Sequence, residues 1–302
     1  MAAKAHPMIG LTLSGGGARG LAHIGVLKVL QRADVRVDCV TGSSMGGILA
    51  AAYAAGFSPA ELEAEALHMA CWRRLVPLID FSPPRRGLLA GRKLRAYLTK
   101  FFPPDLTFAD LHLPLIVEGV DLRTGEEVPL SEGPVLDAVM ATCAYPGVFP
   151  PVEWQGRRLV DGGLLDNLPV DSARALGADI VIASDTDALG DEAQFDCAGS
   201  SSHVPGFLQT AWGAISILTM ARARAKLQTE APDIMIHPKL GPEIGIFSSF
   251  THAAEVIAVG EKAAEQALSR LSRLRARALP EVPPLAAAIE LANLPCAFQQ
   301  MA

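Results

Sequence analysis

Short apolar runs that end in glycine-rich turns alternate with helical patterns near the start of the chain. Residues 8–13 form an apolar run that enters Ser-Gly-Gly-Gly, and residues 21–32 continue as a mostly apolar helical pattern. Residues 37–41 form a second run, which enters the sharp turn GSSMG at residues 42–46 and then a small-residue helix as far as Ala55. Two strand–turn–helix units in so short a stretch predict a parallel sheet with helices on its faces.

Further segments of both kinds follow. Residues 58–61, Ser-Pro-Ala-Glu, have the pattern of a capping box at a helix start. Residues 206–228 predict a long, largely buried helix, and residues 251–277 predict another, with acids early and arginines late. Strands are predicted at residues 115–120, 179–184 and 233–237, with a hairpin of residues 152–154 and 157–160 around Gln155-Gly156.

Composition limits the classes of protein that fit this pattern. Half of the residues are apolar and 19% are charged, which is enough for a sizeable core. No repeat or linker is visible, so we expect one domain over residues 1–280 and a weakly ordered, proline-rich tail over 281–302, with a candidate short helix at 285–291. The net charge of −6 argues against nucleic-acid binding, which requires a basic face.

Cysteine usage and hydropathy bear on the cell compartment. The five cysteines are scattered and form no CxxC pair, so zinc sites and a disulfide framework are poorly supported and reduced thiols are expected. The N-terminus has no signal-peptide pattern. Residues 197–221 carry no charged side chain, but serines, His203, Pro205 and Gly213 dilute their apolar character too heavily for a membrane span. We therefore expect a cytoplasmic protein.

The first turn matches the pattern GxGxxG at Gly15, Gly17 and Gly20. A dinucleotide site of this type needs an acid at the end of the second strand to bind the ribose. That strand ends without an acid, and Asp38 lies at its start. Glycine amides at a helix N-terminus can bind an anion of another kind, such as the oxyanion that develops during acyl transfer.

The second turn matches GxSxG, the nucleophile elbow, at Gly42, Ser44 and Gly46. Such a turn exposes a serine hydroxyl between a strand and a helix. A plain helix start, with Ser43 or Ser44 as the N-cap, is the alternative. Because both glycine turns follow neighbouring parallel strands, they are expected at the same edge of the sheet, where ligands bind.

A serine nucleophile needs a proton acceptor. Three histidines follow a plausible acid, as a Ser–acid–His order would require, but His203, His237 and His252 lie in no glycine-rich turn. Asp161 differs from them, because it directly follows a predicted strand and precedes Gly162-Gly163. An ordinary Asp-Gly turn is the alternative interpretation.

Together these motifs resemble, in order and spacing, the patatin-like phospholipase family. The resemblance covers roughly residues 8–187 and rests on SGGGARG at residues 14–20, GSSMG at 42–46 and DGG at 161–163, supported by PGVFPPV at 146–152 and by Asn167. It implies a three-layer α/β/α fold with a mainly parallel central sheet.

The resemblance also implies a role for each motif residue. Ser44 is expected to be the nucleophile and Asp161 its base. Gly15, Gly16, Gly17 and Arg19 are the expected oxyanion-hole segment, and Gly42, Gly46, Gly162, Gly163 and Asn167 are expected to support the motifs. The implied activity is a serine acyl-hydrolase of the phospholipase A, lysophospholipase or esterase type, which cleaves lipid carboxylic esters through an acyl-enzyme without a metal or cofactor.

Two other functions stay open at this point. An acyltransferase would pass the same acyl-enzyme to an alcohol or thiol acceptor, and a regulatory module would use only the glycine loop to bind a nucleotide. Residues 71–100 also carry eight basic side chains and one acid, Asp80, among apolar residues that include Trp72 and Phe81. This composition suits either a solvated surface or peripheral contact with an anionic membrane.

Overall fold

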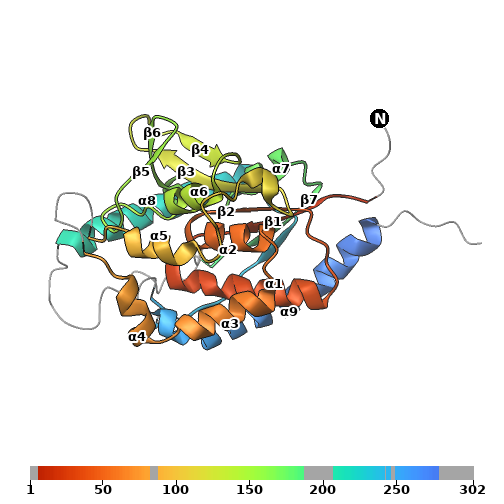
Figure 1. Ribbon diagram of the computed structural model, residues 1–302. Helices are drawn as coiled ribbons and strands as arrows, with labels where there is room; N and C mark the ends of the chain where they lie inside the picture. Colours follow the sequence, from red (N-terminus) through yellow and green to blue (C-terminus); the bar gives the residue numbers. More distant parts are fainter. Residues whose placement is uncertain (1–5, 82–87, 187–206, 242, 246–248, 279–302) are drawn as a thin grey trace, which may run out of the picture.

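The computed structural model describes residues 6–81, 88–186, 207–241, 243–245 and 249–278 of the chain (Figure 1). Its centre is an eight-stranded sheet, and β4 pairs with β3 beside the main path of strands β5-β6-β3-β2-β1-β7-β8. The strands are β1 (Ile9–Leu13), β2 (Cys39–Gly42), β3 (Leu115–Asp121), β4 (Glu127–Leu130), β5 (Val152–Trp154), β6 (Arg157–Asp161), β7 (Ile180–Ser184) and β8 (Ile234–Ile236). Strands β8, β7, β1, β2 and β3 are parallel, whereas β4, β5 and β6 pair antiparallel, so the predicted mainly parallel sheet is confirmed.

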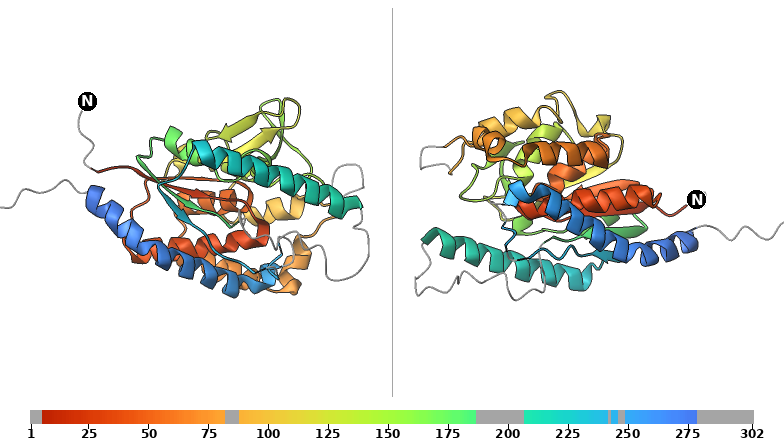
Figure 2. Two further views of the ribbon diagram at one scale, coloured as in Figure 1. Left: turned by 180° about the vertical axis from the view of Figure 1, so that it is seen from behind. Right: turned by 90° about the horizontal axis from the view of Figure 1, so that it is seen from below.

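Helices cover both faces of this sheet, which gives the expected three layers. Figures 1 and 2 show α1 (Ala22–Arg32), α3 (Pro59–Met69) and α9 (Ala253–Ala278) gathered on one side and α8 (Phe207–Thr229) on the other. The remaining α-helices are α2 (Ser44–Ala54), α4 (Trp72–Leu75), α5 (Arg92–Leu98), α6 (Val135–Thr142) and α7 (Val170–Ala175). Short 3₁₀ helices are η1 (Gly17–Leu21), η2 (Val76–Leu78), η3 (Phe108–Asp110), η4 (Gly162–Leu164) and η6 (Ser249–His252).

The two faces of the sheet bury two separate apolar cores. Leu11, Leu13 and Val40 belong to the larger core, which includes α1, α2, α6 and α9. Cys39 and Val181 point to the opposite face and join the smaller core formed with α7. This division follows from the alternation of side chains along a strand, and strands that are buried on both faces are largely apolar.

Local sequence signals explain most of the element boundaries. Ser58 caps α3 through the predicted capping box, in which its hydroxyl accepts from the Glu61 amide and the Glu61 carboxylate accepts from the Ser58 amide. The β5–β6 hairpin turns at Gln155 and Gly156, both with positive φ (47° and 79°), as a two-residue turn requires. The predicted hairpin is therefore confirmed.

The prediction for residues 206–228 is only half right. A helix forms there as α8, but none of the described side chains at 213–229 is fully buried, and Ile217 and Leu218 are 53% and 70% exposed. The helix lies on the outside of the molecule (Figure 2). The absence of charge does not make this helix buried, because its apolar residues do not concentrate on one helical face. Among the helices of the described segments, none is long and apolar enough to cross a membrane. The tail at 281–302 lies outside the described residues.

Candidate active site

Ser44 lies on a strained turn between β2 and α2. Its φ of 50° falls in the left-handed region that side chains other than glycine rarely adopt, which is the backbone strain of a nucleophile elbow. Gly46 permits the turn, because a Cβ there would lie 2.3 Å from the carbonyl oxygen of Leu13. Ser43 occupies the N-cap position but makes no side-chain capping bond, so the helix-start interpretation does not explain the two serines.

Strand pairing brings Asp161 to this turn. Gly42, the last residue of β2, pairs with Val117 of β3, and Asp161, the last residue of β6, pairs with Gly119 of the same strand. Strand β4 pairs with β3 at both Val117 and Gly119, so β2 and β6 must both lie along the other edge of β3. Because β2 is parallel to β3 and β6 is antiparallel to it, β2 and β6 run toward each other along that edge. Their ends meet, and Ser44 follows directly after one of them.

The two side chains are hydrogen-bonded. The Ser44 hydroxyl donates to Oδ2 of Asp161 at 2.8 Å, and the Gly163 amide donates to Oδ1 of Asp161, also at 2.8 Å. Asp161 is 2% exposed. A buried carboxylate that accepts directly from the hydroxyl of a partly buried serine is placed to take the proton of that hydroxyl. The predicted Ser44 and Asp161 are thus brought together.

The glycine loop lies beside this pair. A Cβ on Gly15 would lie 3.1 Å from the Ser44 Cβ, so the loop backbone passes directly against the serine. The amides of Ser44 and Gly15 are engaged, donating to Oγ1 of Thr142 at 3.0 Å and to the Asn167 carbonyl at 3.2 Å. For the amides of Gly16 and Gly17, no acceptor is found within the described part of the chain. These two N–H groups are the candidate donors to an anion.

Asn167 joins the two glycine turns. Its side-chain oxygen would lie 2.4 Å from a Cβ on Gly15 and 2.7 Å from a Cβ on Gly163, so a larger residue at either position would displace the Asn167 amide. Gly162 has a matching constraint, because its Cβ would lie 2.3 Å from the carbonyl oxygen of Glu118 on β3. The predicted supporting residues therefore hold the backbone around Asp161 against the glycine loop.

Arg19 extends away from the serine. The residue is 4% exposed, and its guanidinium donates to the carbonyl oxygen of Leu240 at 3.5 Å, beyond β8. The side chain therefore anchors η1 to the C-terminal part of the fold, and its backbone is what lies in the glycine-loop segment.

The remaining candidate nucleophiles and bases are Cys143 and three histidines. Burial, together with the charge of Asp161, raises the pKa of the Cys143 thiol well above its ordinary value, which keeps that thiol neutral. Nδ1 of His237 lies 3.9 Å from Oδ2 of Asp185, and His252 is the last residue of η6. His203 lies outside the described residues.

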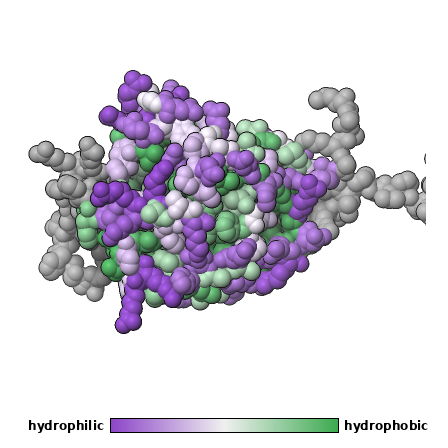
Figure 3. Space-filling view, viewed as in Figure 1, coloured by the Kyte–Doolittle hydropathy of each residue, from purple (hydrophilic) through white to green (hydrophobic). Residues whose placement is uncertain are grey.

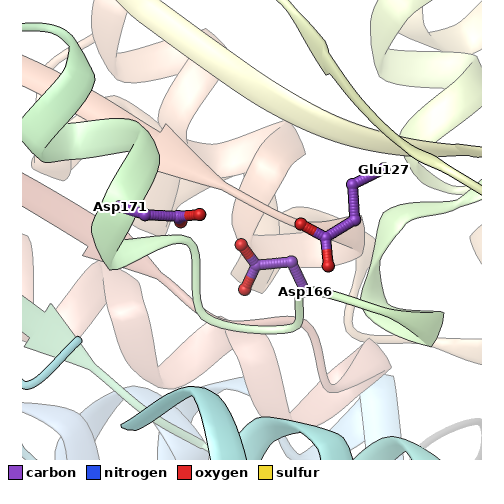
Figure 4. Close-up of side chains that lie close together, drawn as sticks. All are labelled: Glu127, Asp166 and Asp171. Carbon is purple, nitrogen blue, oxygen red and sulfur yellow. The ribbon is translucent and has the colours of Figure 1, made fainter. Parts of the chain in front are cut away.

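A second polar cluster was not predicted from the sequence. The carboxylates of Glu127, Asp166 and Asp171 come within 4.8 Å of one another, as metal ligands do (Figure 4). The ammonium of Lys226 from α8 lies among them, 3.1 Å from Glu127, 2.7 Å from Asp166 and 3.1 Å from Asp171. This cluster, called the Lys226 cluster below, already contains its cation. Glu118 lies beside it, and no sequence spacing connects these residues.

Comparison with known proteins agrees with the geometry. The family model described as patatin-like phospholipase matches residues 11–174. An uncharacterized NTE family protein of Mycobacterium tuberculosis is 36% identical over 180 residues, which are 59% of this chain and 48% of that protein. A lysophospholipase of Aspergillus fumigatus is 32% identical over 188 residues, which are 61% of this chain and 12% of that protein. The chain thus spans less than half the length of these relatives.

The fold has a counterpart among solved structures. The structure of VipD from Legionella pneumophila superposes with a TM-score of 0.56 over 89% of this chain and 67% of that chain, at 16% sequence identity. At that identity the likeness concerns the fold alone. The family model spans more than half of this chain and includes the glycine loop, the elbow turn and the Asp161 turn. The chain belongs to the patatin-like phospholipase family.

Proposed function

We propose that this protein is a serine acyl-hydrolase that cleaves carboxylic esters of lipids, with Ser44 as the nucleophile and Asp161 as its base. The observation that carries the proposal is the 2.8 Å hydrogen bond from the Ser44 hydroxyl, on a strained elbow turn, to the buried Asp161 carboxylate. Family membership supports a lipid substrate, and the fungal relative is named a lysophospholipase.

The proposed reaction has two halves. Asp161 accepts the Ser44 proton while Oγ attacks the ester carbonyl, and the oxyanion is stabilised by the amides of Gly16 and Gly17. Collapse of this intermediate breaks the ester bond, and Asp161 returns the proton to the leaving alcohol. A water molecule then gives a proton to Asp161 and attacks the acyl-enzyme, which releases the fatty acid and restores the Ser44 hydroxyl.

The neighbouring serines provide a matched test. Ser44→Ala is expected to abolish hydrolysis of p-nitrophenyl esters, whereas Ser43→Ala should keep it, because the buried Ser43 hydroxyl has no partner in the described structure. Equal activity of the wild type and Ser44→Ala would refute the nucleophile. Adding an alcohol or thiol acceptor and analysing the products separates hydrolysis from acyl transfer.

A second part of the proposal concerns the membrane. Trp72, Val76 and Phe81 are 57%, 54% and 81% exposed, and exposed arginines lie between and beside them at positions 73, 74 and 92. The one acid of this segment, Asp80, is buried and accepts from the amides at the start of α5. In Figure 3 hydrophilic and apolar residues lie side by side over α4 and α5. We propose that this surface, the α4–α5 rim, contacts an anionic lipid surface.

The rim is connected to the catalytic turn through the backbone. The Leu88 and Leu89 amides donate to the carbonyls of Gly147 and Val148, at 3.0 and 2.9 Å, and three residues earlier the Ala144 carbonyl accepts from the Asp161 amide. A lipid bound at the rim would therefore lie near the segment that leads to Asp161.

Vesicle flotation tests this contact. Trp72→Ser and Phe81→Ser should reduce binding to vesicles that contain phosphatidylglycerol, while Leu122→Ser should not. Leu122 is a suitable control because it is 57% exposed but lies after β3, outside the rim. Flotation that is independent of anionic lipid, or equal for all three variants, would contradict the proposed surface.

A further inference from the structure

A group of buried polar side chains is hydrogen-bonded to the backbone of the glycine loop. Ser14, His23 and Ser184 are 0% exposed and Thr186 is 1% exposed. Ser14 opens the loop, His23 belongs to α1, and Ser184 and Thr186 come from the end of β7 and the residues after it. Buried hydroxyls and a buried imidazole are costly unless they are hydrogen-bonded, so their bonds define what this group does.

Two hydroxyls of this group bind one backbone carbonyl. The carbonyl oxygen of Gly15 accepts from the Ser14 hydroxyl at 3.0 Å and from the Thr186 hydroxyl at 3.1 Å. The Thr186 amide donates in turn to the Ser14 hydroxyl at 2.9 Å, and the two hydroxyl oxygens lie 3.3 Å apart, so Ser14 and Thr186 are bonded to each other as well as to Gly15. A carbonyl oxygen has two acceptor positions, and both are used here.

The direction of this carbonyl determines the direction of the next amide. The peptide between Gly15 and Gly16 is trans, so the Gly16 N–H points opposite to the Gly15 carbonyl. Thr186 follows β7, on one side of β1, whereas Ser44 follows β2, on the other side. A carbonyl held toward Thr186 therefore turns the Gly16 N–H toward the side of Ser44.

The preceding peptide is held at both ends. The Ser14 carbonyl accepts from Nε2 of His23 at 2.9 Å, and the Gly15 amide donates to the Asn167 carbonyl. Nδ1 of His23 then accepts from the Ser184 hydroxyl, also at 2.9 Å. Burial lowers the pKa of His23 to about 4, so the imidazole is neutral at neutral pH with its proton on Nε2. From the Ser14 carbonyl to the Gly16 amide, every backbone polar group except the Gly16 N–H thus has a partner among the described residues.

We propose that Thr186 is a positioning residue, whose hydroxyl holds the Gly15 carbonyl so that the Gly16 N–H is directed at the substrate oxyanion. The inference rests on the proposed acyl-hydrolase function. Thr186 binds the glycine loop at Ser14 and Gly15, so its effect on the oxyanion passes through one peptide group. Preorganised donors of this kind act in the transition state more strongly than in substrate binding.

Three substitutions at this position test the proposal. Thr186→Val removes the hydroxyl and keeps a branched side chain, whereas Thr186→Ala removes the hydroxyl and the branch together. Thr186→Ser keeps the hydroxyl and loses the methyl group. Loss of an oxyanion donor costs about 10²- to 10³-fold in kcat, so a misdirected donor should cost about 10- to 100-fold, with KM little changed. Thr186→Ser should stay close to the wild-type kcat. Far-UV circular dichroism and thermal unfolding establish that each variant is folded.

The affinity of a transition-state-like inhibitor is a second measurement, and it would not change if Thr186 had only a structural role. An alkyl trifluoromethyl ketone forms a tetrahedral adduct with an oxyanion, whereas the matching secondary alcohol does not. The ketone should lose affinity for Thr186→Val and Thr186→Ala by the same factor as kcat/KM, with the alcohol unaffected. Full kcat in both variants, or reduced kcat with unchanged ketone affinity, would overturn the role of Thr186.

Ser44→Ala separates this result from the proposed function itself. If the wild type hydrolyses esters and Ser44→Ala does not, the proposed function stands whatever Thr186 does. If Ser44→Ala is as active as the wild type, the proposed function fails before any Thr186 variant is considered.

Discussion

Asp161 and Asp166 lie in the same turn region and are both buried, yet the structure gives them opposite surroundings. Asp161 accepts from the Ser44 hydroxyl and from a backbone amide. Asp166 binds the ammonium of Lys226 at 2.7 Å, within a cluster of further carboxylates. Identical side chains thus differ in their partners because strand pairing directs one at the Ser44 hydroxyl, while a helix from later in the chain supplies a cation to the other.

The ionisation of the Lys226 cluster shows what burial does when several carboxylates share one cation. Burial raises the pKa of Asp166 to about 7, against the opposing effect of Lys226. Burial also raises the pKa of Glu118 to about 8, although the Ser172 hydroxyl donates to it at 2.6 Å. Burial alone would lower the pKa of Lys226, but its bonds to the carboxylates raise it instead. Asp166 and the neighbouring Glu118 therefore bind protons near neutral pH, and the ammonium of Lys226 offsets the negative charge that remains.

The largest expected effect separates the two aspartates by activity. Asp161→Asn replaces the oxygen that accepts from Ser44 with a donor group, so kcat should fall by about 10³- to 10⁴-fold with little change in stability. Asp166→Asn should keep a kcat close to that of the wild type. Steady-state hydrolysis of p-nitrophenyl esters by both variants is the measurement. Near-normal activity of Asp161→Asn would mean that another group, such as a histidine, is the base.

The second prediction concerns the cation of the Lys226 cluster. Lys226→Met leaves three neighbouring carboxylates without their shared ammonium, so the free energy of unfolding should fall by about 2 to 4 kcal/mol. Arg222→Met is the matched control on the same helix, because Arg222 is half exposed and its ion pair within the described segments is with Glu127, so its loss should cost under about 1 kcal/mol. Urea unfolding at neutral pH measures both. Equal small losses would show that α8 does not stabilise the Asp166 turn.

The third prediction uses pH to examine Glu118, which lies beside the Lys226 cluster. Glu118 has a pKa raised to about 8 by burial, so between its ordinary value and 8 the folded protein holds a proton that the unfolded chain has released. Its stability contribution must therefore decrease as pH rises, by about 1.4 kcal/mol per pH unit. Glu118→Gln should remove this decrease and keep the bond from Ser172. Parallel stability curves of the wild type and Glu118→Gln from pH 6 to 8 would contradict it.

How much the sequence predicts differs between the two regions for a physical reason. The Ser44 turn, the Asp161 turn and the hairpin depend on glycines and strand ends that are local in sequence, so their patterns were readable in advance. Lys226 lies 60 residues from Asp166, and ion pairs over such separations leave no spacing signal. The burial of α8 was mispredicted for a related reason, since the absence of charge does not reveal which side of a helix is covered.

Thr186 and His23 were also missed. Thr186 is one threonine after a strand, and His23 is one histidine in an apolar helix, with no motif around either. Their importance arises only when parallel pairing of β1 and β7 brings the end of β7 beside the glycine loop. A sequence can therefore indicate where a glycine loop lies, while the side chains that hold the carbonyls of that loop become visible only in the fold.

The smallest expected effect lies on the side of the active site and has the opposite sign to that of Glu118. Because burial lowers the pKa of His23 to about 4, the unfolded chain binds a proton between pH 4 and its ordinary value of 6.5, while the folded protein does not. The stability that neutral His23 contributes is complete above 6.5 and decreases as pH falls, by about 2 kcal/mol at pH 5. Thermal or urea unfolding from pH 7.5 to 5 should show a weaker acid loss in His23→Gln than in the wild type. The exposed His68→Gln should follow the wild type. If His23→Gln loses stability in acid as steeply as the wild type, the imidazole is not the neutral group that holds the Ser14 carbonyl.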